Sequence, residues 1–495
     1  MEANSVPPEV AGTDLSSQRP PARIHGVEPR GLRNLPLSPL FEGRFGRLFR
    51  RLPPAPTYSD EQLAELAESM REDPGGNTGS WGQPNAQPED GDNPQIPAAY
   101  TYFGQFIDHD ITFDPVSMLD RVNDPDALQD FRTPRFDLDS LYGSGPSDEP
   151  FQYDRDHPSR FLINEIETGE QDLPRNSQEV ALIGDPRNDE NTIVSQLQLV
   201  FLQAHNKLIA EVEADPDIQS EERFVEAQQR LRWHYQWVVV HDYLTRTCGQ
   251  DAVTKRLHEN PDPAKNEIKN RYYRVRKNAY MPIEFSVAAF RFGHSQVRAA
   301  YNLNEIVTNT PIFAAGDDVG PTDDLRGRKT LPARWEIDWS HLLPLGADKV
   351  QPSRLIDAHL TPALFDLPRF PSDQPQSLAF RNLRRGQALQ LPSGQDVARQ
   401  LKAPRVFSGA ELGTSLDPTP LWFYVLKESE LEEGNAGMRL GYVGAEIVSE
   451  VLLGLLETDP QSYFRVQPDW RPTLPIAEPG SGFSLSDLVR YATAD

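Results

Sequence analysis

Three polar side chains stand at helical spacing in the segment 102–111. If this segment is a helix, Gln105, Asp108 and His109 occupy positions i, i+3 and i+4 and share one face. Asp110 then points elsewhere, about 100° away from His109. Burying an amide, a carboxylate and an imidazole together is costly unless something pairs with them. The pattern therefore indicates either a polar surface or a chemical site.

Spacing alone leaves three interpretations of this face open. The simplest is a hydrogen-bonded histidine at the surface. A second is a metal site made from His109 and its aspartate neighbours, although adjacent residues on a helix diverge and chelate poorly. In the third, His109 is an acid–base group above a cofactor. A histidine with a pKa near neutrality can take a proton from a peroxide and return it to the leaving oxygen.

Further segments carry side chains with similar chemical potential. These are Arg187, Glu190, His294, Asn382, Asp137 and Asp139. Taken singly, each has an ordinary explanation. The first two can form an i, i+3 ion pair at a helix end, and a histidine in an apolar helix is more often a core residue than a ligand. Aspartates in loops are usually solvated, and the arginines around the asparagine can be a basic turn.

Composition limits the classes of partner. The formal net charge of −25 disfavours nucleic acid and anionic lipid, because both need a basic face. A small anionic substrate could still be attracted by local arginines. The single cysteine, Cys248, rules out an intramolecular disulfide.

Targeting signals are also missing from the pattern. No apolar run approaches the roughly 20 residues that span a bilayer. The first ten residues lack the basic start and apolar stretch of a secretory signal. We therefore expect a soluble chain without a membrane span, either cytoplasmic or exported without an N-terminal signal peptide.

The chain divides into an N-terminal arm, residues 1–96, and one large domain, residues 97–495. Residues 1–35 are polar and rich in proline, and residues 36–56 alternate phenylalanines with arginines. This second stretch can be a membrane-surface helix, but a short segment packed on the main body is favoured because prolines close it. Residues 73–97 are rich in Gly, Asn, Asp and Pro, which predicts a loop.

Helical periodicity dominates the large domain. Apolar residues from Ile193 to Val212 recur at steps of three and four, and capping residues precede them. Further helices are predicted near 223–245, 284–300 and 441–457. Convincing strands are scarce, so the fold class is mainly α.

Five segments, in the right order, resemble the peroxidase–cyclooxygenase superfamily. They are Gly104-Gln105-Phe106-Ile107-Asp108-His109-Asp110, residues 137–144, Gly184-Asp185-Pro186-Arg187-Asn188-Asp189-Glu190, Ala289-Phe290-Arg291-Phe292-Gly293-His294-Ser295, and residues 381–386 with Leu391-Pro392 following. The chain thus resembles the animal-type heme peroxidases, which include myeloperoxidase and lactoperoxidase, over about 300 residues. Its single cysteine is closer to what we expect of a bacterial member. The resemblance implies a large single-domain fold with few short strands and a heme b buried between central helices.

On the distal side of the heme, the resemblance assigns roles residue by residue. His109 would move the peroxide proton, and Arg187 would stabilise negative charge as the O–O bond breaks. Gln105 matches the glutamine that contacts halide. Asp108 and Glu190 match the carboxylates that form esters to the heme. Myeloperoxidase carries a methionine directly after this glutamate, where the present chain has an asparagine. Two ester links at most are therefore implied, and efficient chloride oxidation is not.

On the proximal side, His294 would bind iron through Nε2, and its other nitrogen would donate to Asn382. Arg291 would meet a heme propionate, and Gly293 would let the helix lie close to the porphyrin. Phe292 replaces the tyrosine that is usual in the family motif.

The resemblance also implies a calcium site. Its ligands would be Asp110, Thr133, Asp137 and Asp139, with the backbone carbonyl of Arg135. Hard oxygen donors at alternate positions suit Ca²⁺.

The activity implied is a peroxidase that uses hydrogen peroxide to form an oxoferryl intermediate. This intermediate would oxidise small anionic donors (iodide, bromide or thiocyanate) or phenolic donors. A fatty-acid dioxygenase of the same superfamily is an alternative, but Arg291 occupies the position of the radical tyrosine, three residues before His294, and Tyr280 and Tyr301 lie further along the chain. A non-catalytic, calcium-stabilised scaffold is the other alternative, although the residues of the heme site are intact.

Overall fold

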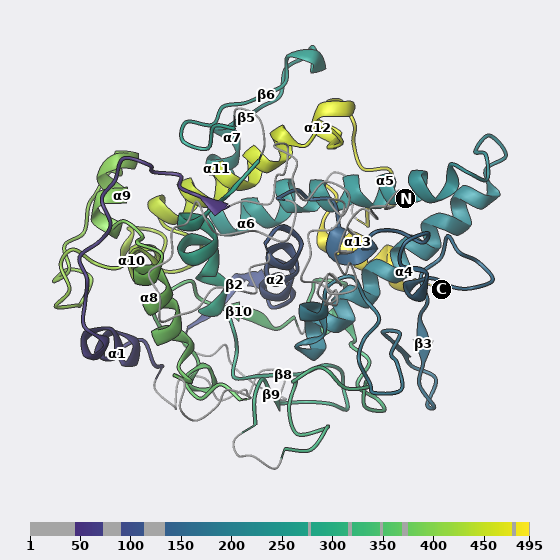
Figure 1. Ribbon diagram of the computed structural model, residues 1–495, viewed down its shortest axis with the longest axis horizontal. Coiled ribbons are helices and arrows are strands. Elements are labelled where there is room, and N and C mark those ends of the chain that lie inside the picture. Colours follow the sequence, from purple (N-terminus) through teal and green to yellow (C-terminus); the bar gives the residue numbers. More distant parts are fainter. Residues whose placement is uncertain are drawn as a thin grey trace, which may run out of the picture.

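Helix α2 (Ala99–Ile111) lies in the middle of the structure, with the other helices arranged around it (Figure 1). The computed structural model describes residues 45–72, 91–112, 134–275, 279–314, 319–346, 350–368, 375–477 and 482–494. All residues of α2 are buried except Gln105 and Asp108, which are half-buried. Gly104 is required there because the Tyr243 hydroxyl packs where a Cβ would stand. The helix that carries the motif is therefore packed into the core, apart from part of its polar face.

The long helix α4 (Thr192–Ala214) forms the second central element. Its apolar residues from Ile193 to Val212 are buried, as the periodicity predicts, and Asn191 caps its first turn by accepting from the Ile193 N–H. The helix ends at the residue before the Asp215-Pro216 pair, consistent with the restriction that proline places on the preceding residue. α4 packs against α2, α5 (Arg223–Val238) and α13 (Leu485–Thr493).

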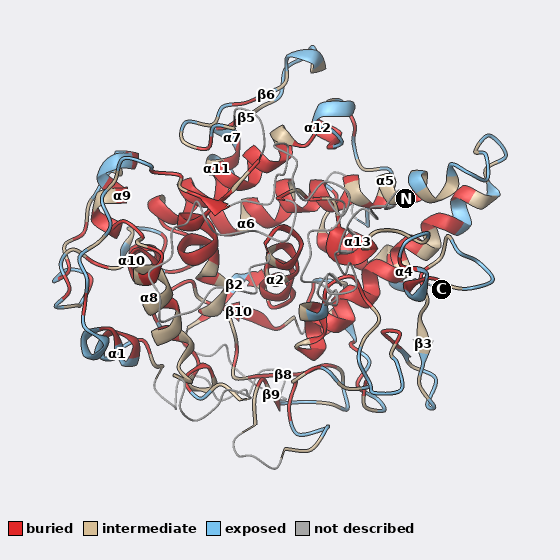
Figure 2. Cartoon of the chain, in the orientation of Figure 1, coloured by how far each residue is buried: buried red, intermediate tan, exposed pale blue. Residues whose placement is uncertain are grey.

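The remaining α-helices complete a mainly helical architecture. They are α1 (Asp60–Glu68), α3 (Asp139–Tyr142), α6 (Leu244–Cys248), α7 (Gln250–Thr254), α8 (Leu378–Ala388), α9 (Gly394–Leu401), α10 (Leu421–Leu431), α11 (Tyr442–Thr458) and α12 (Tyr463–Val466). The predicted helix near 223–245 is α5 continued through a π-helical turn, η5 (Val239–Tyr243), into α6. The predicted helix at 441–457 is α11. Figure 2 shows that burial is concentrated on the central helices.

The described strands are short and form separate pairs. β1 (Phe45–Gly46) pairs with β7 (Met281–Pro282) in parallel. The antiparallel pairs are β2 (Asp92–Pro97) with β10 (Pro352–Arg354), β3 (Asn164–Glu165) with β4 (Gln171–Asp172), β5 (Leu257–His258) with β6 (Glu267–Ile268), and β8 (Ala300–Tyr301) with β9 (Thr310–Pro311). The fold class predicted from the sequence is confirmed.

Two local predictions were wrong. Residues 92–97 form a strand instead of part of a loop, and their two prolines are tolerated because the ladder has only two strands. The helix predicted over 284–300 is a π-helical turn, η7 (Glu284–Ala288), followed by a 3₁₀ segment, η8 (Ala289–His294). Ala288, at φ −129° and ψ −76°, breaks the helical path between them. Apolar periodicity cannot detect such a break.

An N-terminal strap, defined here as residues 45–68, runs over the proximal side of the molecule. Its phenylalanines Phe45 and Phe49 are buried in the core, which favours packing on the main body over a membrane-surface helix. Figure 1 shows the strap passing from β1 along the left edge to α1. Residues 1–44 and 73–90 lie outside the described residues. No helix among the described residues is long and apolar enough to cross a bilayer.

The strap is tied to the element that leads to His294. The buried carboxylate of Glu284, the first residue of η7, accepts from the backbone N–H groups of Leu48, at 2.9 Å, and Phe49, at 3.1 Å. Arg47 donates to the carbonyls of Leu389 and Gln390, just after α8. Strap and proximal elements are thus joined by hydrogen bonds that are wholly or partly buried.

We predict that Glu284→Ala destabilises the protein by about 2–4 kcal/mol, because it leaves two buried N–H groups without their acceptor. A thermal melt is the measurement, with Glu65→Ala, an exposed position on α1, as the matched control. An unchanged Tm for Glu284→Ala would show that these bonds do not hold the strap.

Candidate active site

A cavity of about 570 Å³ is shared by two histidines from distant parts of the chain. His109 lines it from α2, and His294 lines it from the end of η8. Polar residues of the lining come from α2, from the residues just before α4, from η5, η7 and η8, and from the segment 326–328. The apolar lining includes Val297, Ile312, Phe313, Leu364, Leu367 and Leu378. The fold therefore places both histidines that the sequence predicts as site residues at the same cavity.

The distal face of this cavity is built by α2 and Glu190. Gln105, Asp108 and His109 all line the cavity, as their spacing predicts. The Gln105 amide donates to Glu190 Oε1, and His109 Nε2 lies 3.8 Å from the same oxygen. Burial raises the pKa of Asp108 and of Glu190, and the positive charge of Arg187 opposes this rise at both. Two carboxylates and an imidazole thus face a common space.

His109 is oriented from behind by an amide pair that the sequence did not reveal. Asn188 Oδ1 lies 2.7 Å from His109 Nδ1, and Asn188 Nδ2 donates to Gln198 Oε1 at 2.9 Å. Both amides are fully buried. With its Oδ1 facing the ring, Asn188 favours the tautomer in which Nδ1 carries the proton. Nε2 is then left as the basic nitrogen beside the cavity.

Arg187 is placed differently from the prediction. Its guanidinium donates to the carbonyls of His109, at 2.9 Å, and Thr112, at 2.6 Å, and forms an ion pair with the buried Asp185. It is not among the described residues that line the cavity. Arg187 therefore braces the end of α2, and its charge acts on the cavity carboxylates from behind the helix.

The proximal face is a buried chain of hydrogen bonds. Asn382 Nδ2 lies 2.8 Å from His294 Nδ1, and Asn382 Oδ1 accepts from Arg291 at 2.8 Å. Arg291 also donates to the carbonyl of Ser286 in η7. Because Arg291 occupies the amide oxygen, the NH₂ group of Asn382 faces the imidazole. The sequence predicted the reverse direction, with His294 donating to Asn382.

Electrostatics on this face favour a neutral imidazole and an anionic neighbour. Burial, with the nearby Arg291, lowers the pKa of His294 to about 3. A neutral imidazole is the form that binds a metal ion. Burial, together with the charge of Arg385, lowers the pKa of Arg291 to about 10. Two guanidinium groups held close together in the interior favour a ligand that carries carboxylates.

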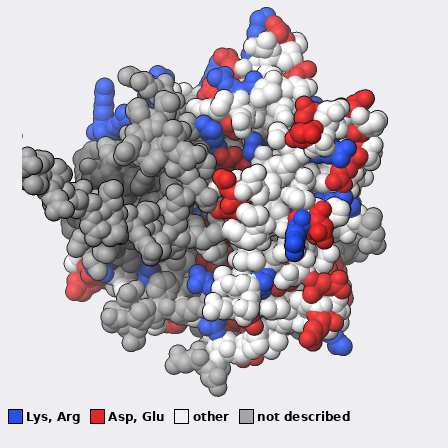
Figure 3. All heavy atoms as spheres, turned by 45° about the vertical axis from the view of Figure 1, so that its right-hand side comes forward, with Lys and Arg blue, Asp and Glu red and all other residues white. Residues whose placement is uncertain are grey.

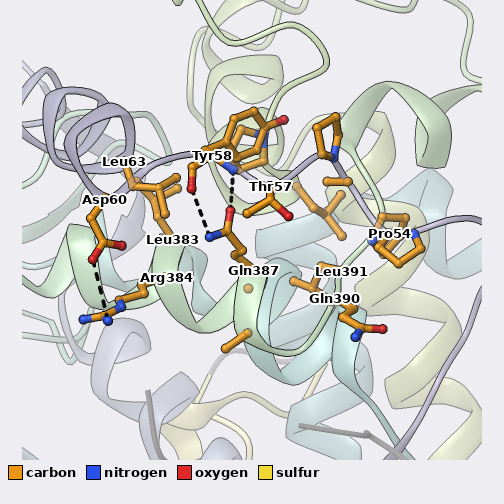
Figure 4. Close-up of a pocket in the computed structure, with 17 residues that line it drawn as sticks. Pro54, Thr57, Tyr58, Asp60, Leu63, Leu383, Arg384, Gln387, Gln390 and Leu391 are labelled. Carbon is orange, nitrogen blue, oxygen red and sulfur yellow. Dashed lines mark hydrogen bonds and ion pairs between the residues drawn. The ribbon is translucent and has the colours of Figure 1, made fainter. Parts of the chain in front are cut away.

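Helix α8, which carries Asn382, is supported by the strap from another direction. Figure 4 shows a second cavity, of about 450 Å³, between the strap and α8. Across it the Gln387 side chain accepts from the Tyr58 N–H at 2.7 Å and donates to the Tyr58 carbonyl at 3.1 Å. Asp60 faces Arg384 at 3.7 Å. The strap thereby fixes the helix on which the partner of His294 stands.

The predicted calcium residues are gathered in part. Asp110 accepts from the N–H groups of Leu138 and Ser140, and Asp137 accepts from the Asp139 N–H. Burial, with the charges of Asp139 and Asp110, raises the pKa of Asp137 well above its usual range. Thr133 lies outside the described residues, and Arg135 stands just before this loop. Within the described residues, no group of three or more His, Cys, Asp or Glu side chains has a metal-binding arrangement.

Several lining residues were missed by sequence reasoning. They are Tyr102, Tyr243, Arg326 and Arg328, together with the apolar wall given above. The first stands three residues before Gln105 on the motif helix, so helical spacing could have placed it on the same face. The two arginines come from a segment with no motif, so no sequence signal places them here.

The comparisons with known proteins agree with this geometry. A sequence model of the animal haem peroxidase family matches residues 132–421, more than half of the chain. The chain therefore belongs to the animal haem peroxidase family. This match includes Glu190, His294 and Asn382 and begins after His109.

Two relatives that the chain matches are themselves named as peroxidases. The chain is 24% identical over 281 residues to "Chorion peroxidase" of Drosophila melanogaster, a match that covers 54% of this chain and 32% of that protein. It is 23% identical over 291 residues to "Heme peroxidase 2" of Caenorhabditis elegans, covering 56% of this chain and 39% of that protein. The matches thus span less than two fifths of the length of either relative.

Solved structures share the fold at low identity. Peroxidase A from Dictyostelium discoideum matches with a TM-score of 0.59 and 16% identity, covering 92% of this chain and 93% of that one. A fatty acid alpha-dioxygenase from Arabidopsis thaliana matches with a TM-score of 0.57 and 16% identity, covering 89% and 76%. The fold is therefore common to peroxidases and dioxygenases.

The family implies heme, and the cavity fits it. A Cβ built on Gly293 would meet no atom within 4 Å, so this glycine leaves open space beside His294. The lining combines apolar side chains with a neutral imidazole on one face and the guanidinium of Arg291, which suits a propionate. These are the properties that a buried porphyrin needs.

We predict that Gly293→Val lowers the affinity for heme by about tenfold, because the added side chain occupies the space that the cofactor needs. Heme titration followed by absorption measures this. Gly386→Ala is the matched control, since its Cβ would face Leu391 in the other cavity at 3.3 Å. Equal heme affinity for Gly293→Val and the wild type would contradict the assignment of this cavity to heme.

Proposed function

We propose that this protein is a heme peroxidase that reduces hydrogen peroxide at the expense of phenolic donors or small anions such as iodide, bromide and thiocyanate. One observation carries the proposal. His109 and His294 line a single cavity, the first oriented as a base by Asn188 and the second kept neutral by burial and the charge of Arg291. With a phenol, two donor molecules each lose one electron and one proton, and hydrogen peroxide is reduced to two waters.

The distal residues handle the peroxide. His109 Nε2 takes a proton from one peroxide oxygen and returns it to the other, which leaves as water. Gln105 and Glu190, joined by a hydrogen bond, form the polar wall beside His109 and position the peroxide and the small anion. Arg187 holds the end of α2 and keeps the carboxylates of Asp108 and Glu190 closer to their ionised form.

The proximal residues hold the cofactor. His294 is the proposed iron ligand, with Asn382 beside its Nδ1, and Arg291 faces the propionates from the cavity lining. When bound there, heme would supply the two-electron redox chemistry that peroxide reduction needs. Ester bonds from Asp108 and Glu190 to the heme are proposed because both carboxylates line the cavity.

Calcium is proposed as a structural ion near the loop that carries Asp137 and Asp139. The support is the mutual repulsion of these carboxylates with Asp110, which a divalent cation would relieve. Because Asp110 accepts hydrogen bonds from the loop backbone, it is committed to bracing that loop as well.

Fatty-acid dioxygenation is not the favoured activity. The position three residues before His294 is Arg291, whose side chain is bound to Asn382 and to the Ser286 carbonyl. It supplies no phenol, so the hydrogen-abstracting group would have to come from elsewhere in the lining.

The function predicts a heme absorption band that shifts when hydrogen peroxide is added, together with oxidation of guaiacol or iodide. His294→Ala should lose or alter the band, and His109→Leu should keep it but react with peroxide at least about a hundredfold more slowly. Stopped-flow absorption measures both. Heme that extracts freely into acidified organic solvent would contradict the ester links, and a wild type that binds no heme would refute the proposed function.

The orientation of His109 gives a second prediction. Asn188→Ala should slow the reaction with peroxide by about ten- to a hundredfold, while the KM for the donor stays unchanged, because only the peroxide step needs the unprotonated Nε2. Asn188→Asp keeps an oxygen facing Nδ1 and should retain most of the rate. Cyanide affinity, measured at the heme band, should fall in parallel in Asn188→Ala. If both variants reacted as fast as the wild type, Asn188 would not orient His109.

A further inference from the structure

A second cationic group lies at the point where the cavity meets solvent. Arg328 belongs to the cavity lining and is also exposed, unlike Arg291 on the proximal face. Burial raises the pKa of Glu190, and the positive charge of Arg328, like that of Arg187, opposes this rise. Arg328 therefore stands on the route between bulk water and the distal face.

The backbone around Arg328 is fixed by the start of α4. The N–H of Arg328 donates to the Asp189 carbonyl at 2.7 Å, and the N–H of Gly327 donates to the Glu190 carbonyl at 3.0 Å. Thr192 N–H bonds back to Leu325. Gly327 is required here, because a Cβ would collide with the Asp189 backbone. The segment that carries the arginine is thus docked beside a predicted heme-bonding carboxylate.

Arg328 also adopts an uncommon backbone conformation. Its φ is +60°, in the left-handed region that non-glycine residues seldom occupy. Such outliers persist only where surrounding contacts determine them, and they gather at functional sites. The backbone bonds to Asp189 and Glu190 supply those contacts, and they aim the arginine at the cavity.

The two arginines of this segment differ in whether a carboxylate of the described residues pairs with their charge. Arg326 is paired with the buried Asp324 at 2.6 Å. For Arg328, no carboxylate among the described residues lies within ion-pair distance. In a chain of net charge −25, whose visible face in Figure 3 carries scattered acidic side chains, this leaves a local attraction for an anion.

Part of the lining of this cavity is apolar. Ile312, Phe313, Leu364, Leu367 and Pro368 line it together with Arg328. A halide has no apolar surface to bury against such residues. An organic carboxylate has a negative group that suits the arginine and an apolar body that suits the apolar lining.

We propose that Arg328 and the apolar residues beside it form a binding site for an organic electron donor that carries a carboxylate on an apolar body. This rests on the proposed peroxidase function and names the class of donor. The carboxylate pairs with Arg328, and the body lies against Phe313 and the leucines, so that the oxidisable part points into the cavity.

The test uses two phenols that differ only in charge, 3-(4-hydroxyphenyl)propionate and its neutral amide. In the wild type, the KM of the acid should be about fivefold lower than that of the amide, and Arg328→Gln should abolish this difference. Arg328→Lys should preserve it. The dissociation constants of both phenols, measured by calorimetry on the heme-loaded protein without peroxide, should follow the same pattern. Added salt should weaken binding of the acid only.

Arg334→Gln is the matched control. Arg334 is exposed, has a φ of +67° and lies outside the cavity lining, so its replacement changes net charge equally. The proposal is overturned if the wild type oxidises acid and amide with equal KM, or if Arg334→Gln acts as Arg328→Gln does. It is overturned too if Arg328→Gln no longer binds heme, since the arginine would then hold the cofactor. A wild type that oxidises neither phenol nor halide would instead refute the peroxidase function.

Discussion

The chain of hydrogen bonds from His294 through Asn382 to Arg291 is the interaction on which the site depends. It joins η8 and α8, which are separated by almost ninety residues, and it continues to η7 through the Ser286 carbonyl. Each link is at least partly buried, so the loss of one member leaves the next without its partner. The strap holds both ends, through Glu284 and Gln387. The proximal wall is thus a braced surface against which the cavity is kept open.

The distal helix and its polar face could be predicted from the sequence, because a helix places i, i+3 and i+4 together whatever surrounds it. The same holds for α4, whose apolar stripe is long and capped. Asn188 could not be predicted in its observed role. Its bond to His109 joins residues 79 apart and depends on how η4 (Pro186–Asp189) docks on α2. The order of the motifs identified both histidines as site residues. The packing of distant segments against one another determines how their rings are oriented.

The differences from prediction have a common physical origin. Arg187 was expected in the cavity, yet carbonyls at the end of α2 and the carboxylate of Asp185 offer it several acceptors behind the helix. The direction of the Asn382 amide follows from a third residue, Arg291, that competes for its oxygen. A sequence motif names the participants in such a network. It does not give the order in which donors and acceptors are matched, which depends on every neighbour at once.

The two π-helical turns have a consequence for how this architecture can vary. η5 contributes Tyr243 to the cavity and η7 contributes Ser286, so each described π turn touches the site. A π turn holds one residue more than the α-helical turn it replaces, and it rotates everything beyond it relative to what came before. Helix α5, before η5, can therefore keep its packing on α4, while α6, after η5, presents a different side to its neighbours. Single-residue insertions and deletions at these turns are accordingly the steps by which related sequences could reshape the cavity without rebuilding the helical core.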